Sequence, residues 1–162
     1  QNRDRAYMVS ILNGTDDDFI VPEQNEFTSL RISDILTKNQ DEKYYKDFKR
    51  FYPPIIEENI TKTGINAFNL INYINYKSEC RVYFPNSIAP TITAVGAQSR
   101  VKVYDNGRVR QISPREAWKL MGFTDSDFDK VEGTLSDTVL SKQAGNSIAV
   151  GVLEAIFKNL FK

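Results

Sequence analysis

The chain has 162 residues, 41% of them hydrophobic and 26% charged, a composition that suits a soluble globular protein of one domain, or of a small domain plus part of a second. Lysine and arginine total 21, and aspartate and glutamate also total 21, so a nucleic acid would have to be bound by local basic patches. The absence of histidine excludes histidine general bases, Ser-His-Asp triads and most zinc sites, and we expect no metal site.

The N-terminal segment is polar before it becomes apolar. Residues 1–5 are polar or charged, unlike a signal peptide, and no later apolar run approaches the roughly 20 residues of a membrane-spanning helix. The near-continuous apolar run Tyr7–Leu12 predicts a strand covered on both faces in a parallel or mixed sheet. Arg3 and Arg5 project to the same side and could hold an anion or a carbonyl oxygen. On local grounds a solvated charged loop is favoured over that function.

The stretch from about residue 27 to residue 90 has an irregular pattern that predicts a small β-rich or mixed subdomain. Ser33 is a candidate N-cap for a short helix. Lys43–Tyr52 interleaves cations with aromatic rings, which suits nucleic-acid binding or, as we favour, an amphipathic helix with snorkelling lysines. The single Cys80 permits no internal disulfide, so we expect a cytoplasmic protein.

A threonine-rich segment, Ile88–Ala94, follows this subdomain. The hydroxyls of Thr91 and Thr93 and the backbone N–H groups could contact phosphates and set the register on DNA. In isolation, the start of a β-strand with ordinary β-branched residues is the favoured interpretation.

Regular alternation returns at residue 101. Val101–Tyr104 and Val109–Ile112 alternate around the turn residues Asp105-Asn106-Gly107, which predicts a β-hairpin. A local basic excess accompanies it, formed by Arg100, Lys102, Arg108, Arg110 and Arg115. The alternation permits a phosphate-contacting face or a two-sided exposed hairpin with solubilising charges, and the sequence leaves both open.

Helix signals fill the C-terminal third. Ser113, Pro114 and Glu116 form an N-cap, a first-position proline and a capping box, and Gly122 predicts the end of that helix. A second helix should begin at residue 136 and close at Gly145, and a third should run over residues 148–161 with one apolar stripe.

The junction between the last two helices carries two polar residues, Asn146 and Ser147. We place them at a helix N-terminus, where backbone donors favour a bound carboxylate or phosphate. Simple N-capping by either residue is the commoner role of such a motif.

The order and spacing of these motifs resemble the DNA (cytosine-5) methyltransferase family. Gln-x-Arg-x-Arg at residues 1–5 is similar to the family's eighth motif, and Ala89–Thr93 looks like the end of its target recognition domain. Arg108–Glu116 with Leu120–Phe123 resembles the ninth motif, and Gln143–Ile148 resembles the tenth.

The resemblance implies an α+β fold. Residues 1–14 would supply one strand and a loop of a Rossmann-like methyltransferase domain. Residues 15–112 would form a small, irregular, β-rich target recognition domain, and residues 113–162 the helices that return to the catalytic domain.

The resemblance also implies a function: transfer of a methyl group from S-adenosylmethionine to C5 of a cytosine flipped out of a specific duplex sequence, in a bacterial restriction-modification system. Arg5, supported by Arg3 and Gln1, would hold the flipped base. Double-stranded DNA would be contacted by Thr91, Thr93, Arg100 and Lys102, and Asn146 and Ser147 would line the S-adenosylmethionine pocket. Arg115 and Glu116 would be structural ion-pair members.

The family's nucleophile lies in a Pro-Cys dipeptide, whereas Cys80 lies in Ser-Glu-Cys-Arg. No Phe-x-Gly-x-Gly loop or Glu-Asn-Val motif is present either. We therefore expect an inactive C-terminal fragment, with the N-terminal catalytic portion in the same or a separate chain and a cognate restriction endonuclease as a further partner. The alternatives are the smaller subunit of a split enzyme and a stand-alone DNA-binding module, which the neutral charge disfavours.

Overall fold

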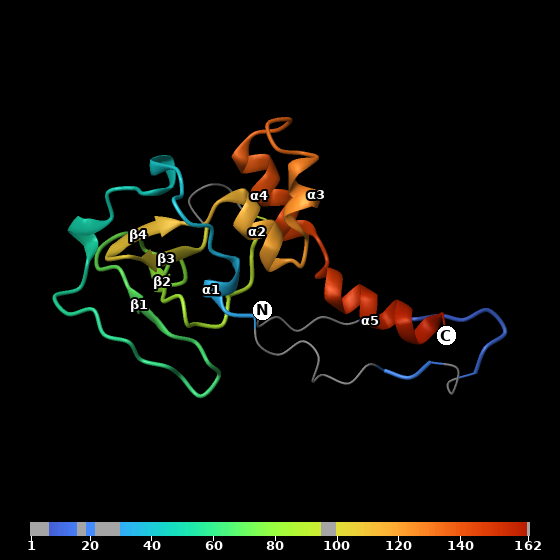
Figure 1. Ribbon diagram of the computed structural model, residues 1–162. Coiled ribbons are helices and arrows are strands. Elements are labelled where there is room, and N and C mark those ends of the chain that lie inside the picture. Colours follow the sequence, from blue (N-terminus) through green and yellow to red (C-terminus); the bar gives the residue numbers. More distant parts are fainter. Residues whose placement is uncertain (1–6, 16–18, 22–29, 95–99, 162) are drawn as a thin grey trace.

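The computed structural model describes residues 7–15, 19–21, 30–94 and 100–161. A four-stranded sheet and its surrounding loops form one side of the molecule, short helices pack beside it, and the last helix extends away from both (Figure 1). The elements, in chain order, are α1 Ile32–Ile35, η3 Glu42–Tyr44, η4 Lys49–Phe51, β1 Ala67–Asn69, β2 Arg81–Tyr83, β3 Lys102–Asp105, β4 Arg108–Gln111, α2 Pro114–Leu120, α3 Asp125–Asp129, α4 Asp137–Asn146 and α5 Val150–Leu160.

The sheet is mixed, with the strand order β1-β2-β3-β4. The outer pairs β1–β2 and β3–β4 are antiparallel, and the central pair β2–β3 is parallel, with Val82 opposite Lys102. The hairpin predicted from alternation is confirmed as β3 and β4. Its two turn residues, Asn106 and Gly107, have φ of 48° and 82°, the left-handed geometry that matches the twist of the strands.

Helix α2 begins and ends as its sequence predicts. The side chain of Ser113 accepts a hydrogen bond from the N–H of Glu116, whose carboxylate accepts one from the N–H of Ser113. Gly122 then takes a φ of 91°, which stops the helix.

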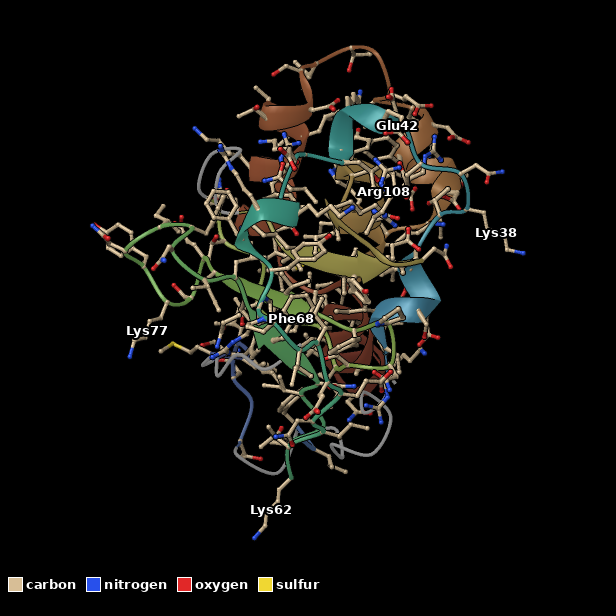
Figure 2. The ribbon with its side chains drawn as sticks, turned by 90° about the vertical axis from the view of Figure 1, so that its left-hand side faces the viewer. Lys38, Glu42, Lys62, Phe68, Lys77 and Arg108 are labelled. Atoms are coloured by element: carbon tan, nitrogen blue, oxygen red, sulfur yellow. The ribbon has the colours of Figure 1, made fainter. Side chains whose placement is uncertain are left out.

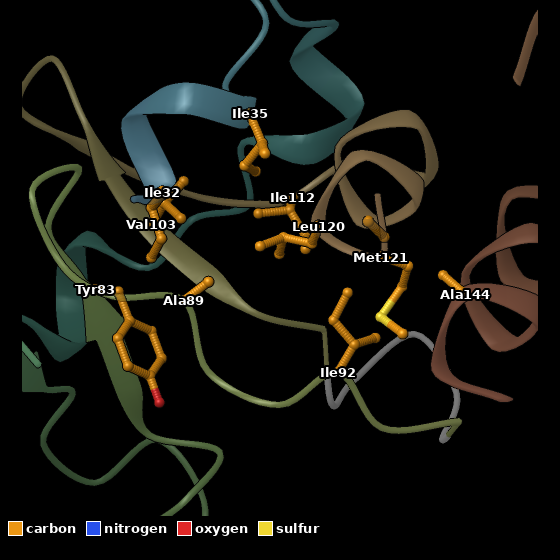
Figure 3. Packing of buried hydrophobic residues seen from close by; sticks show 11 residues of the cluster. Ile32, Ile35, Tyr83, Ala89, Ile92, Val103, Ile112, Leu120, Met121 and Ala144 are labelled. Atoms are coloured by element: carbon orange, nitrogen blue, oxygen red, sulfur yellow. The ribbon is translucent and has the colours of Figure 1, made fainter. Parts of the chain in front are cut away.

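Two apolar clusters lie on the two faces of the sheet. One contains Tyr83 and Val103 with residues of α1, α2 and α4, and Figure 3 shows the side chains converging between these elements. The other is largely aromatic and contains Phe48, Phe68 and Val82. Successive strand residues point to opposite faces, so neighbours such as Val82 and Tyr83 belong to different clusters.

The first cluster joins residues from both sides of position 112. Ile112 packs there with α1 before it and α2 after it. The observed arrangement is a small mixed α/β unit with a four-stranded sheet, while the domain boundaries at residues 14 and 112 stay predictions.

Three predicted elements are wrong or shifted. Tyr7–Leu12 forms no strand, because a strand needs a hydrogen-bonded neighbour and none among the described residues pairs with it; Met8 and Leu12 are more than nine-tenths exposed. Helix α1 has Arg31 as its N-cap instead of Ser33, because Ile32 and Ile35 are buried and the N–H of Ile32 bonds to the carbonyl of Ser87.

The segment Lys43–Tyr52 forms two short 3-10 turns, η3 and η4, rather than one amphipathic helix. Its two buried rings are directed to different parts of the molecule. The hydroxyl of Tyr44 donates to Asp137 at the start of α4 at 2.9 Å, whereas Phe48 packs in the aromatic cluster. A single helix would have placed both rings, four residues apart, on one face.

Candidate functional site

The threonine-rich segment Ile88–Ala94 is a loop that runs from the sheet to the helices. Ile88 forms an isolated bridge with Arg31, and the described residues 89–94 form no strand, so the strand interpretation is wrong. Ala89 and Ile92 are buried in the first cluster and hold the loop in place. Thr91 is half-buried and Thr93 is exposed.

This loop borders a hollow of about 390 Å³ beside the beginnings of β2 and β3, the two central strands of the sheet. The lining residues are Ser78, Glu79, Arg81, Tyr83, Pro90, Thr91, Thr93, Arg100, Val101 and Lys102. All four residues that the sequence assigned to DNA contact therefore line one hollow, although they come from the loop and from the start of β3.

The guanidinium of Arg100 is only partly hydrogen-bonded to the described residues. Its Nη2 donates a long hydrogen bond of 3.5 Å to the hydroxyl of Thr138 on α4, while its Nε is buried and has no hydrogen-bond partner among the described residues. A guanidinium with a spare donor suits an anionic oxygen.

Lys102 differs from the other three residues because it is 2% exposed. Its Nζ donates to the carbonyl oxygen of Glu79 at 2.8 Å and lies 5.1 Å from the centre of the Tyr73 ring, on the aromatic face of the sheet. Burial lowers the pKa of Lys102 to about 8. Lys102 thus holds the carbonyl group of Glu79 at the rim of the hollow, and its own side chain is almost inaccessible to a ligand.

Two residues of the hollow were missed by sequence reasoning, Arg81 and Tyr83. They alternate with the buried Val82 on β2, so both belong to the same face, and Arg81 is exposed. Burial raises the pKa of the Tyr83 hydroxyl, against the lowering effect of Arg81. The sequence signal that could have identified Arg81 and Tyr83 was their alternation around Val82. That signal is weak because the strand is only three residues long.

The basic residues of the two hairpin strands do not share one exposed face. Arg110 is fully buried, with its guanidinium 2.8 Å from Glu116 and 2.7 Å from Asp105. Arg108 makes a bidentate pair with Glu42, seen at the surface in Figure 2.

Arg115 is likewise occupied by carboxylates. Its guanidinium pairs with the acidic side chains of Asp125, Asp129 and Glu132. The structural ion-pair roles expected for Arg115 and Glu116 are confirmed.

Asn146 and Ser147 lie at the C-terminal end of α4, so the predicted helix N-terminus is wrong. Asn146 is the last residue of α4 and is exposed, and Ser147 is its C-cap, donating its hydroxyl to the carbonyl of Ala144 at 2.7 Å. Helix α5 begins later, with Ala149 as its N-cap. Gly145, predicted to end the helix, lies within it.

The three residues of the first motif, Gln1, Arg3 and Arg5, lie outside the described residues, and their proposed support of the flipped base stays a prediction. Within the described ranges, no three metal-ligating side chains gather into a cluster. No helix in those ranges has the length and apolarity to cross a membrane.

The chain belongs to the family described as C-5 cytosine-specific DNA methylase, which it matches over residues 1–162. It is 35% identical to the Type II methyltransferase M2.ScrFI of Lactococcus lactis subsp. cremoris, over 100% of this chain and 41% of that protein. It is 33% identical to the Orphan methyltransferase M.SssI of Spiroplasma monobiae, over 99% of this chain and 41% of that protein. The Type II methyltransferase M.Bsp6I of a Bacillus species is 28% identical, over 100% of this chain and 50% of that protein. The chain thus spans two fifths to one half of the length of these relatives, and the family resemblance of its motifs is confirmed.

Proposed function

We propose that the chain is the C-terminal, DNA-recognition part of a DNA (cytosine-5) methyltransferase. The observation that carries this proposal is the meeting of two motifs far apart in sequence. The loop with Thr91 and Thr93 lies against the end of α4 that carries Asn146 and Ser147, with a Cβ at the intervening Gly145 excluded by the loop backbone. A site for DNA and a site for a methyl donor must be adjacent in such an enzyme.

In the proposed complex, the hollow beside the loop takes the backbone of double-stranded DNA. Thr91 and Thr93 contact phosphate oxygens, and Arg100, with Arg81 beside it, supplies positive charge. Lys102 supports the rim from below through its bond to Glu79. These contacts set register, while base edges are read by other side chains of the recognition region.

The end of α4 suits the amino-acid part of S-adenosylmethionine. The carbonyl groups at a helix C-terminus carry partial negative charge that favours an ammonium group. Helix α5 begins at Val150, whose N–H donates to the carbonyl of Met121 at 2.8 Å, so a carboxylate there would be favoured by the partial positive charge of the helix N-terminus rather than by that N–H. Asn146 and Ser147 stand between these two ends and would hold the cofactor, which supplies the methyl group.

The nucleophile of the proposed reaction comes from residues outside this chain. Cys80 is 7% exposed, and its Sγ donates to the carbonyl of Ile74 at 3.3 Å, so it packs as a buried structural residue. Arg5, with Arg3 and Gln1 in support, would hold the cytosine that has been flipped from the duplex into the catalytic pocket.

The partner that completes the enzyme is the N-terminal catalytic portion, in the same chain or as a separate subunit. The existence of such a partner is supported by an apolar hollow of about 290 Å³. The residues that line it are Tyr7, Val9, Phe19, Val21, Val152, Ala155 and Ile156. The neighbouring apolar side chains of Met8, Leu12 and Ile20 are exposed. Such exposure is expected if the catalytic portion supplies the strands that would pair with this segment and cover it. The names of two relatives contain "Type II methyltransferase", which supports a role in a restriction-modification system alongside an endonuclease.

The proposal is tested by incubating the complete protein with duplex DNA and S-adenosylmethionine carrying a labelled methyl group, then identifying the methylated base after hydrolysis. We expect 5-methylcytosine; N4-methylcytosine, or no transfer from a protein that contains a Pro-Cys motif, would refute the reaction. Arg5→Ala should slow methylation by about 100-fold, as loss of one stabilising donor does in other active sites, with DNA affinity nearly unchanged. An unchanged rate would remove Arg5 from the active site.

Co-expression separates the single-chain enzyme from a split one. If this chain is a subunit, it should restore methylation to a catalytic portion supplied as a second polypeptide and inactive by itself. A stand-alone DNA-binding module would bind duplex DNA without affinity for such a partner.

A further inference from the structure

Gly145 makes an unusually close approach to the threonine-rich loop. A Cβ built on Gly145 would lie 2.5 Å from the backbone nitrogen of Ala94, 2.5 Å from the carbonyl carbon of Thr93 and 2.6 Å from its oxygen. These three atoms all belong to the loop backbone, so no side-chain rotation could relieve the contact. Any side chain at position 145 must move either the loop or helix α4.

The requirement for glycine at this position is steric. Gly145 lies inside α4, between Ala144 and the last helical residue, and has ordinary helical geometry. A glycine inside a helix destabilises that helix relative to alanine, because its backbone loses more conformational freedom on folding. Helix α4 has its glycine at a position where the loop backbone lies directly against the helix.

Helix α4 is held more firmly than the loop segment that touches it. Leu140 and Ala144 are buried, and the indole Nε1 of Trp118 on α2 donates to the carbonyl of Leu140 at 3.0 Å. The loop is anchored by Ile92, which lies with Met121 and Ala144 in the core shown in Figure 3. Beyond Ile92 the loop emerges from the core, and Thr93 is exposed. An added methyl group would therefore displace residues 93–94.

We propose that Gly145 is a positioning residue that sets the distance between the DNA-contacting loop and the cofactor-binding end of α4. By lacking a side chain, it lets the peptide between Thr93 and Ala94 rest directly on the helix, one residue before Asn146. Two groups that serve different ligands are thereby held in one rigid arrangement. This role rests on the proposed function and adds to it a residue that touches neither ligand.

The test is Gly145→Ala in the complete protein, with two affinities measured separately. Binding of a short duplex is followed by fluorescence anisotropy, and binding of S-adenosylhomocysteine by calorimetry. We expect the dissociation constant for DNA to rise about tenfold, equivalent to the loss of one hydrogen bond to a charged phosphate. The dissociation constant for S-adenosylhomocysteine should change by less than about twofold, a difference of well under 1 kcal/mol.

The matched control is Val139→Ala, an exposed position six residues earlier on the same helix and outside the tenth motif, which should leave both affinities unchanged. Unchanged DNA affinity in Gly145→Ala overturns the positioning role. Equal loss of both affinities, or loss of the folded protein, also overturns it, because α4 would then be the part that moves. If the unsubstituted protein binds neither duplex nor S-adenosylhomocysteine, the proposed function itself fails.

Discussion

At the residue scale, the buried pair Arg110–Glu116 joins three parts of the chain. The two guanidinium nitrogens Nη1 and Nη2 lie 2.8 Å and 2.9 Å from the carboxylate oxygens of Glu116. The same carboxylate accepts hydrogen bonds from the N–H groups of Ser113 and Thr37, at 2.8 Å each. Burial lowers the pKa of Arg110, but Glu116 and Asp105 raise it more, and the net shift is upward. The guanidinium of Arg110 therefore stays charged, and its burial depends on the hydrogen bonds to the carboxylate of Glu116.

We expect Glu116→Gln to destabilise the protein by about 3–5 kcal/mol, because it leaves the buried charge of Arg110 only partly compensated. The measurement is the midpoint of urea unfolding. Glu42→Gln is the matched control, since Glu42 makes the same bidentate contact with Arg108 at an exposed site (Figure 2), and its midpoint should not move. Equal midpoints for the two variants would contradict the role of burial.

At the element scale, the hairpin β3–β4 is the part of the sheet that the local sequence specifies most completely. The alternation of apolar and polar residues determines which side chains lie on each face of the sheet. Asn106-Gly107 determines the turn, because both residues tolerate positive φ. The strand β2, by contrast, is only three residues long and pairs in parallel with β3, twenty positions further along the chain. Its pairing depends on a long connection that carries no local signal.

The turn provides a clean test of this local control. A Cβ at Gly107 would meet no atom within 4 Å, so Gly107→Ala changes only the backbone preference at a φ of 82°. We expect a loss of about 1 kcal/mol, measured by urea unfolding, because an L-residue disfavours left-handed geometry. Asn106→Gly, at the neighbouring φ of 48°, should leave stability nearly unchanged. If Gly107→Ala unfolds at the wild-type urea concentration, the turn does not limit the hairpin.

At the scale of the whole molecule, a chain of zero net charge can still present positive charge locally. Most of the hairpin's cations are neutralised by acidic partners, as Arg108 is by Glu42. Arg81 and Arg100 line the hollow beside the threonine loop, and neither has an ion-pair partner within the described ranges. The proposed DNA affinity should therefore depend on these two arginines more than on the net charge.

The salt dependence of DNA binding measures this distribution. For the complete protein, Arg81→Ala and Arg100→Ala should each reduce the slope of log affinity against log salt by about 0.9, the value for one phosphate contact. Arg108→Ala should leave the slope unchanged, because its charge is already paired with Glu42. A reduced slope for Arg108→Ala, with no change for the other two, would relocate the DNA contact to the hairpin.

The sequence by itself determined the family, the hairpin and the limits of α2, since each depends on residues close together in the chain. Ser113 caps its own helix, and Asn106-Gly107 closes its own turn. The sequence also proposed Thr91, Thr93 and Arg100, whose ligand stays a prediction although the structure brings them to one hollow.

Only the tertiary structure decided which charges are available and why Gly145 must be glycine. Lys102 and Arg110 look equivalent to Arg100 in the sequence, yet both are buried and bonded within the protein. The N–H of Thr37 donates to Glu116, which lies 79 positions away in the sequence. Gly145 contacts the backbone of Thr93, and no periodic pattern in the sequence predicts that contact. Such contacts arise from how the two sides of the core pack, which is a property of the folded chain rather than of any local segment.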